Sequence, residues 1–503
     1  MGIVIRQSIK ATVANYVAVV LGYLNLGYFF PKLFSTEQIG LISFILGTST
    51  LLISFFQLGS PSAIIKFYPE VKEKNQEKDF LKFTLFIPLL LFIVLFSILA
   101  LISPYIFNQF YSESPLIKEY FILIPILSLC MGFSGIFTAH CNSLLRIVIP
   151  TIIEKFLTRL LVFIMILLVL FYSLDFNSFT YGYVIIYAVC LILTVVYFFV
   201  IKPKNSHSKA LKISSKFKKN ATKFGAISFL TIVGGRIVEN IDIIMISSMI
   251  DLSSAGIYKI AFYIGGVIMI PLSTIGQISS PLFAQFWNKK QYHKINQLYK
   301  KASINLILIG GILFTGILIN LDNIFEVMPN GETYKKDGFW IILIIAGGKM
   351  INMGMSLNGH LLQNSKYYYI NTYSILILGA LTIITNYIFI PMEGPFGGII
   401  GAAIASSLSL VLFNLFKFGF ILVKFKMSPF SSKTIPATII LISLFFLNLL
   451  IPKLSNVFLD IFIRSSVISI LFLLTTYFLH ISADANKLIE VYLKKIIPWK
   501  KQP

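Results

Sequence analysis

Long apolar segments separated by short polar ones make up most of the chain. Many of these segments reach the roughly 20 residues that a helix needs to cross a hydrocarbon core about 30 Å thick. Their apolar residues run on without the period-two alternation of barrel strands, so the pattern predicts membrane-spanning helices. The fourteen predicted spans are 8–30, 39–60, 80–103, 118–140, 147–173, 180–201, 222–247, 255–284, 302–320, 338–362, 368–390, 396–422, 434–451 and 460–480.

Composition agrees with an all-α membrane protein. Of the 503 residues, 57% are hydrophobic and 12% are charged, whereas a soluble domain carries about 25% charged residues. The net charge of +22 comes without any nucleic-acid-binding motif, so nucleic acid is not an expected partner. The three cysteines lie in or beside apolar segments without metal-ligand spacing, so no metal site is expected either.

The basic residues predict the orientation. They cluster in the segments 66–82, 202–223, 289–301 and 487–501. With a cytoplasmic N-terminus, about 30 Lys and Arg fall in cytoplasmic segments and about six in external loops, as the positive-inside rule requires. Both termini are then cytoplasmic. The apolar run after Arg6 and Lys10 has no small-residue cleavage site, which predicts an uncleaved first span.

An internal repeat organises the chain. FSTEQIGL at residues 34–41 recurs as DLSSAGIY at 251–258, and the Ser60-Pro61 pair recurs as Ser280-Pro281. Offsets near 216 to 220 relate two six-span halves, and an even number of spans gives both halves the same orientation. The sequence thus predicts two parallel six-helix lobes around a central cavity, plus two further helices.

The predicted domains follow from this repeat. They are an N-lobe at 1–201, a basic linker at 202–221, a C-lobe at 222–423, two extra helices at 424–480 and a basic amphipathic tail at 481–503. The tail has two equally supported interpretations, an interfacial helix on the cytoplasmic surface or an ordinary basic tail.

Three basic residues fall near the membrane midplane. Counting about 1.5 Å per residue from the start of each span puts Lys349 roughly 16 Å deep, and Arg159 and Arg236 roughly 18 Å deep. Lys259 and Lys417 lie nearer the span ends, where their side chains could reach the interface. Charges at the midplane usually face a cavity or a partner, so the inventory predicts a cationic cavity suited to an anionic cargo such as a diphosphate.

Polar residues near these charges extend the candidate site. Lys155 lies four residues before Arg159, and two like charges on one face favour an anion between them. Asn352, Ser356 and Gln363 continue a stripe from Lys349. Asn15 and Asn25 form a weaker stripe on the first span, and Asn371 lies on the eleventh. For these weaker stripes, hydrogen bonding between helices is an equally good explanation.

A group of charges on the seventh span has two interpretations. Arg236 and Glu239 are one turn apart and can pair, with Asp242 close behind. Either an arginine anchors the substrate while a carboxylate tunes it and binds a coupling cation, or the group is an internal ion pair without a ligand.

The sequence resembles the polysaccharide-transport branch of the multidrug/oligosaccharidyl-lipid/polysaccharide exporter superfamily, which includes the O-antigen and capsule flippases. The likeness spans essentially the whole chain. It is carried by the opening IKATVANYVAVVLGYLNLGYFFPKLFSTEQIGLISFILGTSTLLISFFQLGSPSAIIKFYPE, residues 9–70, and by DLSSAGIYKIAF, residues 251–262. These diffuse patterns are typical of the family and do not specify a substrate.

The resemblance implies a multi-pass protein of the bacterial plasma (inner) membrane. It would carry an undecaprenyl-diphosphate-linked oligosaccharide, such as an O-antigen, capsule or exopolysaccharide repeat unit, to the outer leaflet by alternating access, beside the polymerase and export machinery. Relatives line the central cavity with basic residues, and the positions here that could play this role are Arg159, Arg236 and Lys349. Some relatives couple transport to sodium or protons, and by position Glu239, Asp242 and Asn371 could serve here. No other cofactor is implied.

Two alternatives remain open. One is a cation-coupled small-molecule exporter, although the drug exporters of this superfamily carry a first-span carboxylate where this chain has asparagines. The other is a membrane enzyme of the same pathway, although the longest external loop, at 321–337, has only about 17 residues and no nucleotide-binding motif is present. The sequence therefore favours a transporter over an enzyme. The first two spans also lack the arginines of dedicated lipid II flippases.

Overall fold

The computed structural model describes residues 17–112, 114–202, 212–355, 357–487 and 490. Asn15, Ser356, residues 203–211 of the predicted linker and the predicted tail face beyond residue 487 lie outside these ranges. The described residues form helices joined by short turns, with no β-strand among them. The chain divides into two compact units, Met1–Lys259 and Ile260–Pro503.

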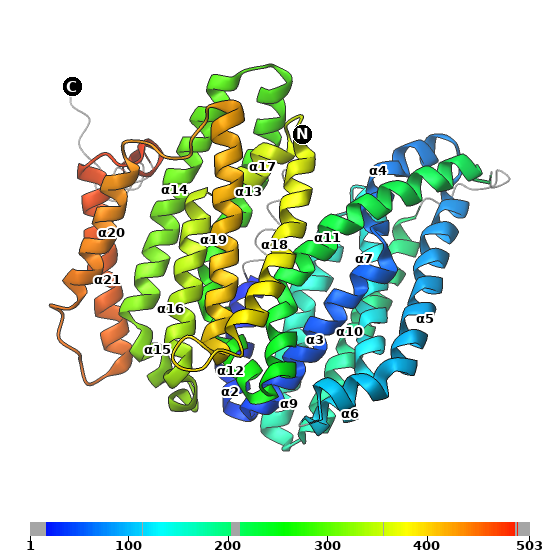
Figure 1. Ribbon diagram of the computed structural model, residues 1–503, viewed down its shortest axis with the longest axis horizontal. Helices are drawn as coiled ribbons and strands as arrows, with labels where there is room; N and C mark the ends of the chain where they lie inside the picture. Colours follow the sequence, from blue (N-terminus) through cyan, green and yellow to red (C-terminus); the bar gives the residue numbers. More distant parts are fainter. Residues whose placement is uncertain (1–16, 113, 203–211, 356, 488–489, 491–503) are drawn as a thin grey trace. The chain divides into compact units, whose positions relative to one another are not determined.

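Unit 1 spans the first half of the chain, up to Lys259 (Figure 1). Its helices are η1 (Leu24–Phe29), α2 (Phe30–Leu33), α3 (Thr36–Gln57), α4 (Ser60–Glu73), α5 (Glu77–Phe110), α6 (Pro115–Tyr120), α7 (Leu123–Ser143), α8 (Val148–Thr151), η2 (Ile152–Leu157), α9 (Thr158–Tyr172), α10 (Phe176–Ile201) and α11 (Ser215–Met249). The unit boundary falls inside α12 (Leu252–Gly266), beyond the predicted linker. Helices η1 and η2 are π-helical.

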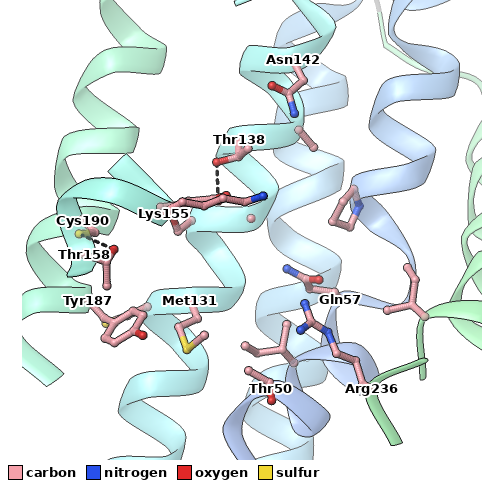
Figure 2. Close-up of a pocket in the computed structure, with 18 of the residues that line it drawn as sticks. Thr50, Gln57, Met131, Thr138, Asn142, Lys155, Thr158, Tyr187, Cys190 and Arg236 are labelled. Carbon is pink, nitrogen blue, oxygen red and sulfur yellow. Dashed lines mark hydrogen bonds between the residues drawn. The ribbon is translucent and has the colours of Figure 1, made fainter. Parts of the chain in front are cut away.

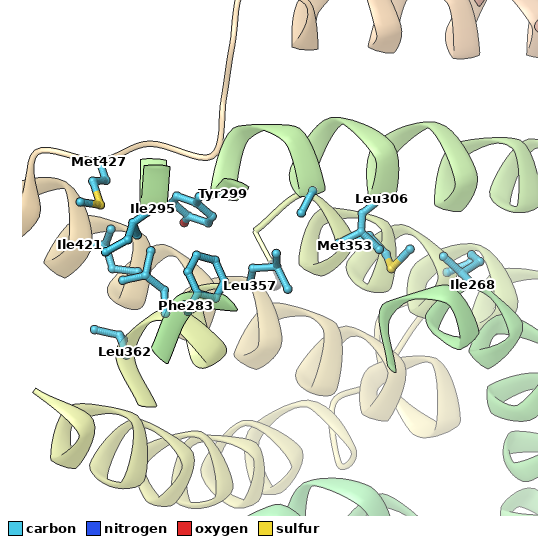
Figure 3. Close-up of a cluster of buried hydrophobic side chains, with 13 residues drawn as sticks. Ile268, Phe283, Ile295, Tyr299, Leu306, Met353, Leu357, Leu362, Ile421 and Met427 are labelled. Carbon is cyan, nitrogen blue, oxygen red and sulfur yellow. The ribbon is translucent and has the colours of Figure 1, made fainter. Parts of the chain in front are cut away.

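Unit 2 continues from α12. Its helices are η3 (Val267–Met269), α13 (Ile270–Asn288), α14 (Tyr292–Ile319), α15 (Leu321–Val327), α16 (Gly331–Met355), α17 (Asn358–Gln363), α18 (Tyr368–Phe389), α19 (Gly398–Phe425), α20 (Thr434–Asn448) and α21 (Val457–Phe478). An apolar cluster runs along α14 from Ile268 at one end to Met427 at the other (Figure 3).

In the part of the chain that the structure describes, ten helices are long and apolar enough to cross a membrane, and each coincides with a predicted span. The other four predicted spans also contain helix, but each for its own reason falls short of that standard. The first is described only from Val17 and the thirteenth is 15 residues long. A π-helical turn interrupts the fifth, and α11 carries the charges of the seventh. The all-helical membrane class is confirmed, while the count of fourteen stays a prediction.

Burial differs sharply between helices. In their most apolar windows α3, α7 and α14 are 67%, 61% and 61% buried, whereas α5 is 6% buried. Because the exposed side chains of α5 are themselves apolar, lipid is the solvent that suits them. Unit 1 is therefore organised around α3 and α7, which run side by side with α10 against α7.

The two copies of the repeated motif contact each other at the starts of α3 and α12. Thr36 Oγ1 lies 2.5 Å from Ser253 Oγ. A Cβ on Gly40 would fall 1.8 Å from the Leu252 carbonyl oxygen, and one on Gly256 would fall 2.0 Å from that of Thr36. Both glycines thus admit a backbone-to-backbone approach. The contact is reciprocal, as expected for repeats related by a pseudo-twofold axis.

The end of unit 2 is held by polar contacts. Asp484, which follows α21, lies 2.7 Å from the Lys301 ammonium and accepts a 3.0 Å hydrogen bond from Asn305. Within α21, Arg464 Nε donates to Asp460 Oδ2 at 2.6 Å, and both side chains are buried. Asp460 also accepts a 2.6 Å bond from Asn323, which ties α21 to α15.

Candidate functional site: a charged cavity in unit 1

Unit 1 contains a cavity of about 540 Å³ whose walls come from seven helices, with Pro61 and Ile65 of α4 among the lining residues. Figure 2 shows its labelled side chains converging from α3, α7, η2, α9, α10 and α11. The lining includes Thr50 and Gln57 of α3, Ser134, Thr138 and Asn142 of α7, Glu154 and Lys155 of η2, Thr158 of α9, Tyr187 of α10 and Arg236 of α11. Apolar side chains, among them Ile53, Met131 and Ile232, complete the lining.

The formal charges in this cavity are two cations and one carboxylate. Lys155 and Arg236 both line it, together with Glu154. Thr138 Oγ1 donates a 2.7 Å hydrogen bond to Glu154 Oε1. No Lys or Arg among the described residues lies within 4.0 Å of the Glu154 carboxylate. An excess positive charge thus remains for an anionic ligand.

Arg236 is only weakly paired within the protein, so its guanidinium can still bind a ligand. The predicted pair with Glu239 is confirmed, but its N–O distance is 3.5 Å and its side chains are 43% and 67% exposed. An exposed pair of that length contributes little, and Glu239 does not line the cavity. Figure 2 shows the guanidinium beside Gln57, whose amide donates to the Gly132 carbonyl at 2.6 Å.

Arg159 lies one helical turn beyond Lys155 but does not line this cavity. Its backbone carbonyl accepts a 2.9 Å hydrogen bond from Asn25 Nδ2. That bond joins the π-helical part of the first predicted span to the helix that follows η2. Asn25 is 5% exposed, so the structure gives it a contact between helices, the alternative that the sequence left open.

The proposed cation-coupling residues have different surroundings. Asp242 is buried, and Tyr258 donates a 2.5 Å hydrogen bond to its carboxylate. Glu239 is exposed and interacts electrostatically with Lys259 as well as with Arg236. Asn371, in unit 2, accepts a 3.1 Å hydrogen bond from the Lys417 ammonium. Each therefore has a protein partner in the structure.

Two of the predicted residues of unit 2, Lys349 and Asn352, contact neighbouring helices of that unit. The Lys349 ammonium lies 3.8 Å from the centroid of the Phe262 ring. Asn352 accepts a 2.9 Å bond from Asn414 and donates to Met269 Sδ at 3.5 Å. The polar stripe on α16 thus faces neighbouring helices of the same unit.

Lys417 departs from its predicted place at the interface. Its side chain is 5% exposed. The ammonium contacts the Asn371 amide oxygen and lies 4.0 Å from the Phe413 ring centroid. The sequence position near the end of a span does not reveal this burial, because α19 is covered there by α17 and α18.

Reasoning from the sequence alone missed two features. Glu154, next to Lys155 in the sequence, was not among the predicted site residues, yet it is the carboxylate of the cavity. Asp460 and Arg464 were missed, although opposite charges four residues apart inside an apolar span signal a buried pair. Among the described residues, no group of three or more His, Cys, Asp or Glu side chains is placed to hold a metal.

The fold belongs to the class of flippases and multidrug transporters. A lipid II flippase, MurJ, in an inward closed conformation matches with a TM-score of 0.74 at 18% identity, covering 94% of this chain and 99% of that one. An inward-facing multidrug transporter of the MATE family matches with a TM-score of 0.67 at 12% identity, covering 83% and 98%. At these identities the likeness concerns the fold.

The chain belongs to the polysaccharide biosynthesis protein family, whose model matches residues 4–287. It is 26% identical over 425 residues to the uncharacterized membrane protein MJ1375 of Methanocaldococcus jannaschii, covering 82% of this chain and 97% of that protein. It is also 22% identical over 235 residues to the probable low-salt glycan biosynthesis flippase Agl15 of Haloferax volcanii, covering 45% and 49%. These matches confirm the predicted superfamily, and the chain is a multi-pass membrane flippase or transporter.

Proposed function

We propose that the protein moves a lipid-linked oligosaccharide, carried on a diphosphate such as undecaprenyl diphosphate, from the cytoplasmic to the outer leaflet by alternating access. Membership of the polysaccharide biosynthesis family supports the glycan. The named flippase relative and the MurJ-like fold support movement of a lipid. O-antigen, capsule and exopolysaccharide repeat units all fit this class of cargo.

The observation that carries the proposal is the pair of cations in the unit 1 cavity. Lys155 and Arg236 come from helices far apart in sequence and reach the same space. A diphosphate loses its hydration when it enters a membrane protein, and charge-assisted hydrogen bonds from such cations offset that loss. The neutral polar groups around them suit sugar hydroxyls.

Energy coupling would use a sodium ion or a proton. Of the carboxylates near the site, Glu154 lines the cavity itself and has one hydroxyl donor, Thr138. A cation bound at Glu154 would raise the positive charge of the cavity and favour an anionic cargo, and its loss would favour release. Asp242 and Glu239 would need to give up Tyr258 and Arg236 to do the same.

The experiment reconstitutes the full chain in proteoliposomes with a fluorescent isoprenoid diphosphate that carries N-acetylglucosamine. Transbilayer movement is followed by the loss of signal to an impermeant quencher. Lys155→Gln/Arg236→Gln should slow it at least about tenfold, because each charge-assisted hydrogen bond contributes about 1.5–3 kcal/mol. Lys118→Gln/Arg146→Gln removes the same charges outside the cavity and should transport normally.

Equal rates for the cavity variant and its control would remove the cavity from the mechanism. Movement of the probe without its diphosphate at the same rate would argue against anion recognition. In the native host, deletion of the gene should leave the lipid-linked glycan on the cytoplasmic leaflet, with loss of surface glycan.

A small-molecule exporter is the second candidate, favoured by the carboxylate of Glu154 and by the fold shared with multidrug transporters. A cationic drug would pair with Glu154 rather than with Lys155 and Arg236. Energised efflux of a cationic dye that Glu154→Gln abolishes, with normal surface glycan in the deletion strain, would establish this alternative.

The proposed location is the plasma membrane, with both termini in the cytoplasm. The charge distribution along unit 2 supports this orientation. Lys290, Lys366 and Lys424 lie at one end of its helices, whereas Asp322 and Glu326 follow the opposite end of α14. The polymerase and export machinery of the same pathway would be the protein partners.

A further inference from the structure

Unit 2 has a second pocket, of about 550 Å³, at the basic end of its helices. It lies where α13, α17 and α19 finish, at Asn288, Gln363 and Phe425. We call it the basic aromatic pocket, and its defining residues are Lys290, Lys366 and Lys424 with Trp287, Tyr292 and Tyr367.

The three lysines of this pocket have no acceptor among the residues that the structure describes. No carboxylate of the described residues lies within 4.0 Å of their ammonium groups, and none of the three donates a hydrogen bond there. The Lys366 ammonium has a distant ring contact, 5.0 Å from the Tyr367 centroid. Three like charges around one space repel one another unless an anion lies between them.

Helix capping does not account for these lysines. Basic residues often bind the free carbonyls at a helix C-terminus. At α13, however, backbone amides bind those carbonyls, with Lys290 N donating to Trp287 O at 3.0 Å and Gln291 N to Phe286 O at 2.9 Å. At α19, Lys426 N donates to Leu422 O at 3.1 Å. The side chains therefore stay available for a ligand.

The aromatic side of the pocket is built by packed rings. The Trp287 and Phe425 centroids are 4.9 Å apart, and those of Tyr367 and Phe425 are 5.7 Å apart. Trp287 Nε1 donates to the Leu361 carbonyl at 3.3 Å, which fixes the indole. Such a wall supplies apolar contact beside the three charges.

Exposed tyrosines indicate the depth of the pocket. Tyr292, Tyr368, Tyr369 and Tyr373 are 52%, 62%, 43% and 59% exposed. Exposed tyrosine and tryptophan side chains are enriched at the level of the lipid headgroups, where one end is apolar and the other is wet. The pocket therefore lies where lipid phosphates are concentrated, and basic pockets between helices at that level bind anionic headgroups.

We propose that the basic aromatic pocket binds the phosphate of an anionic lipid. The headgroup lies among Lys290, Lys366 and Lys424, and the start of its hydrocarbon contacts Trp287 and Phe425. The phosphate could come from a bulk phospholipid or from an isoprenoid diphosphate. The first source is independent of the proposed function, and the second would make this pocket a docking site for cargo before it enters the membrane-spanning part.

The test uses Trp287 as the reporter in the full chain. Trp340→Phe and Trp499→Phe leave it as the single tryptophan. The purified protein, in a neutral detergent, is titrated with dihexanoyl phosphatidylglycerol, dihexanoyl phosphatidylcholine, farnesyl diphosphate and farnesol while the indole fluorescence is recorded. The anionic probes should change the emission at lower concentrations than their uncharged or zwitterionic counterparts.

The pocket variant is Lys290→Gln/Lys366→Gln/Lys424→Gln, and its control is Lys289→Gln/Lys294→Gln/Lys426→Gln, which removes three charges that do not line the pocket. The pocket variant should bind the anionic probe about tenfold more weakly or worse, and the control should stay within about twofold. If the triple variant does not fold, Lys424→Gln alone should still weaken binding by about threefold.

A loss confined to phosphatidylglycerol would support the bulk-lipid source, and a loss confined to farnesyl diphosphate would support the isoprenoid source. Equal losses in both triple variants, or no preference of the parent protein for either anionic probe, would overturn the proposal. Failure of glycan transport in the cavity experiment would leave this result unaffected, because the two sites share no residue.

Discussion

Replacing Gly40 by alanine should open the contact between the two copies of the repeated motif. The new Cβ would fall 1.8 Å from the Leu252 carbonyl oxygen, where ordinary contact begins at 3.4 Å. Both partners are backbone, so no side chain can rotate away. The starts of α3 and α12 must therefore separate by at least 1.6 Å. Overpacking of this kind costs about 1–3 kcal/mol and more against backbone, while alanine returns about 1 kcal/mol of helix propensity. We expect a net loss of about 2 kcal/mol.

The assay is thermal unfolding read by a thiol-reactive dye, since the three cysteines are buried and unpaired in the structure. For a unit of about 250 residues the expected fall in Tm is about 4 °C or more. Gly235→Ala is the matched control, because its Cβ would meet nothing within 4 Å. Gly256→Ala should act like Gly40→Ala, and the pair should be less than additive because they disturb one contact. A Tm for Gly40→Ala at or above that of the control would refute the reasoning.

Three further predictions concern unit 2. Asp460→Ala leaves the buried Arg464 guanidinium without its carboxylate and should cost about 3–5 kcal/mol in the free energy of unfolding; a change under about 1 kcal/mol in a denaturation series would contradict it. Lys417→Met removes a buried charge and should leave the Tm unchanged or higher, whereas Asn371→Leu deprives the ammonium of its acceptor and should cost about 1–3 kcal/mol; the reverse order would show that the pair stabilises the fold. At Asp484, partial burial raises the carboxyl pKa, but the hydrogen bonds and charge of its partners outweigh this and hold the pKa below its usual value. A lowered pKa stabilises the folded state above about pH 4 and loses that stabilisation as the pH falls through the folded pKa. Because the pair is exposed, this pH-dependent stabilisation should stay below about 1 kcal/mol. Limited proteolysis measures how readily the C-terminal end is released as the pH falls, and Asp484→Asn should remove that acid dependence.

The helices of this protein were predictable because the bilayer leaves the backbone little choice. A continuous apolar run of this length must satisfy its own hydrogen bonds within lipid, and helices do so. Two of the four predicted spans that fall short carry extra chemistry, namely α11 with Arg236 and the fifth span with its π-helical turn. These two departures lie beside the cavity, whereas the thirteenth span, α20, falls short only in length.

The candidate site was predictable in part. Depth counting singled out Arg236, and the structure brings it into one cavity with Lys155. Depth counting could not show that Glu154 lines the cavity while Arg159 does not. That difference depends on which side of η2 and α9 faces the cavity. The contact between Lys417 and Asn371 joins residues on different helices, and a single sequence carries no signal of such pairings.

The π-helical turn at Ile152–Leu157 has a consequence for how this chain tolerates changes of length. A π turn closes with i→i+5 hydrogen bonds and so contains one residue more than an α turn needs. Deleting one residue from an ordinary helix rotates everything after it by about 100°. Deleting one residue from η2 would instead convert the turn to α-helix and leave α9 facing its present neighbours. The π-helical segment includes Glu154 and Lys155, so deleting either of them would keep the fold while the cavity loses a charged side chain.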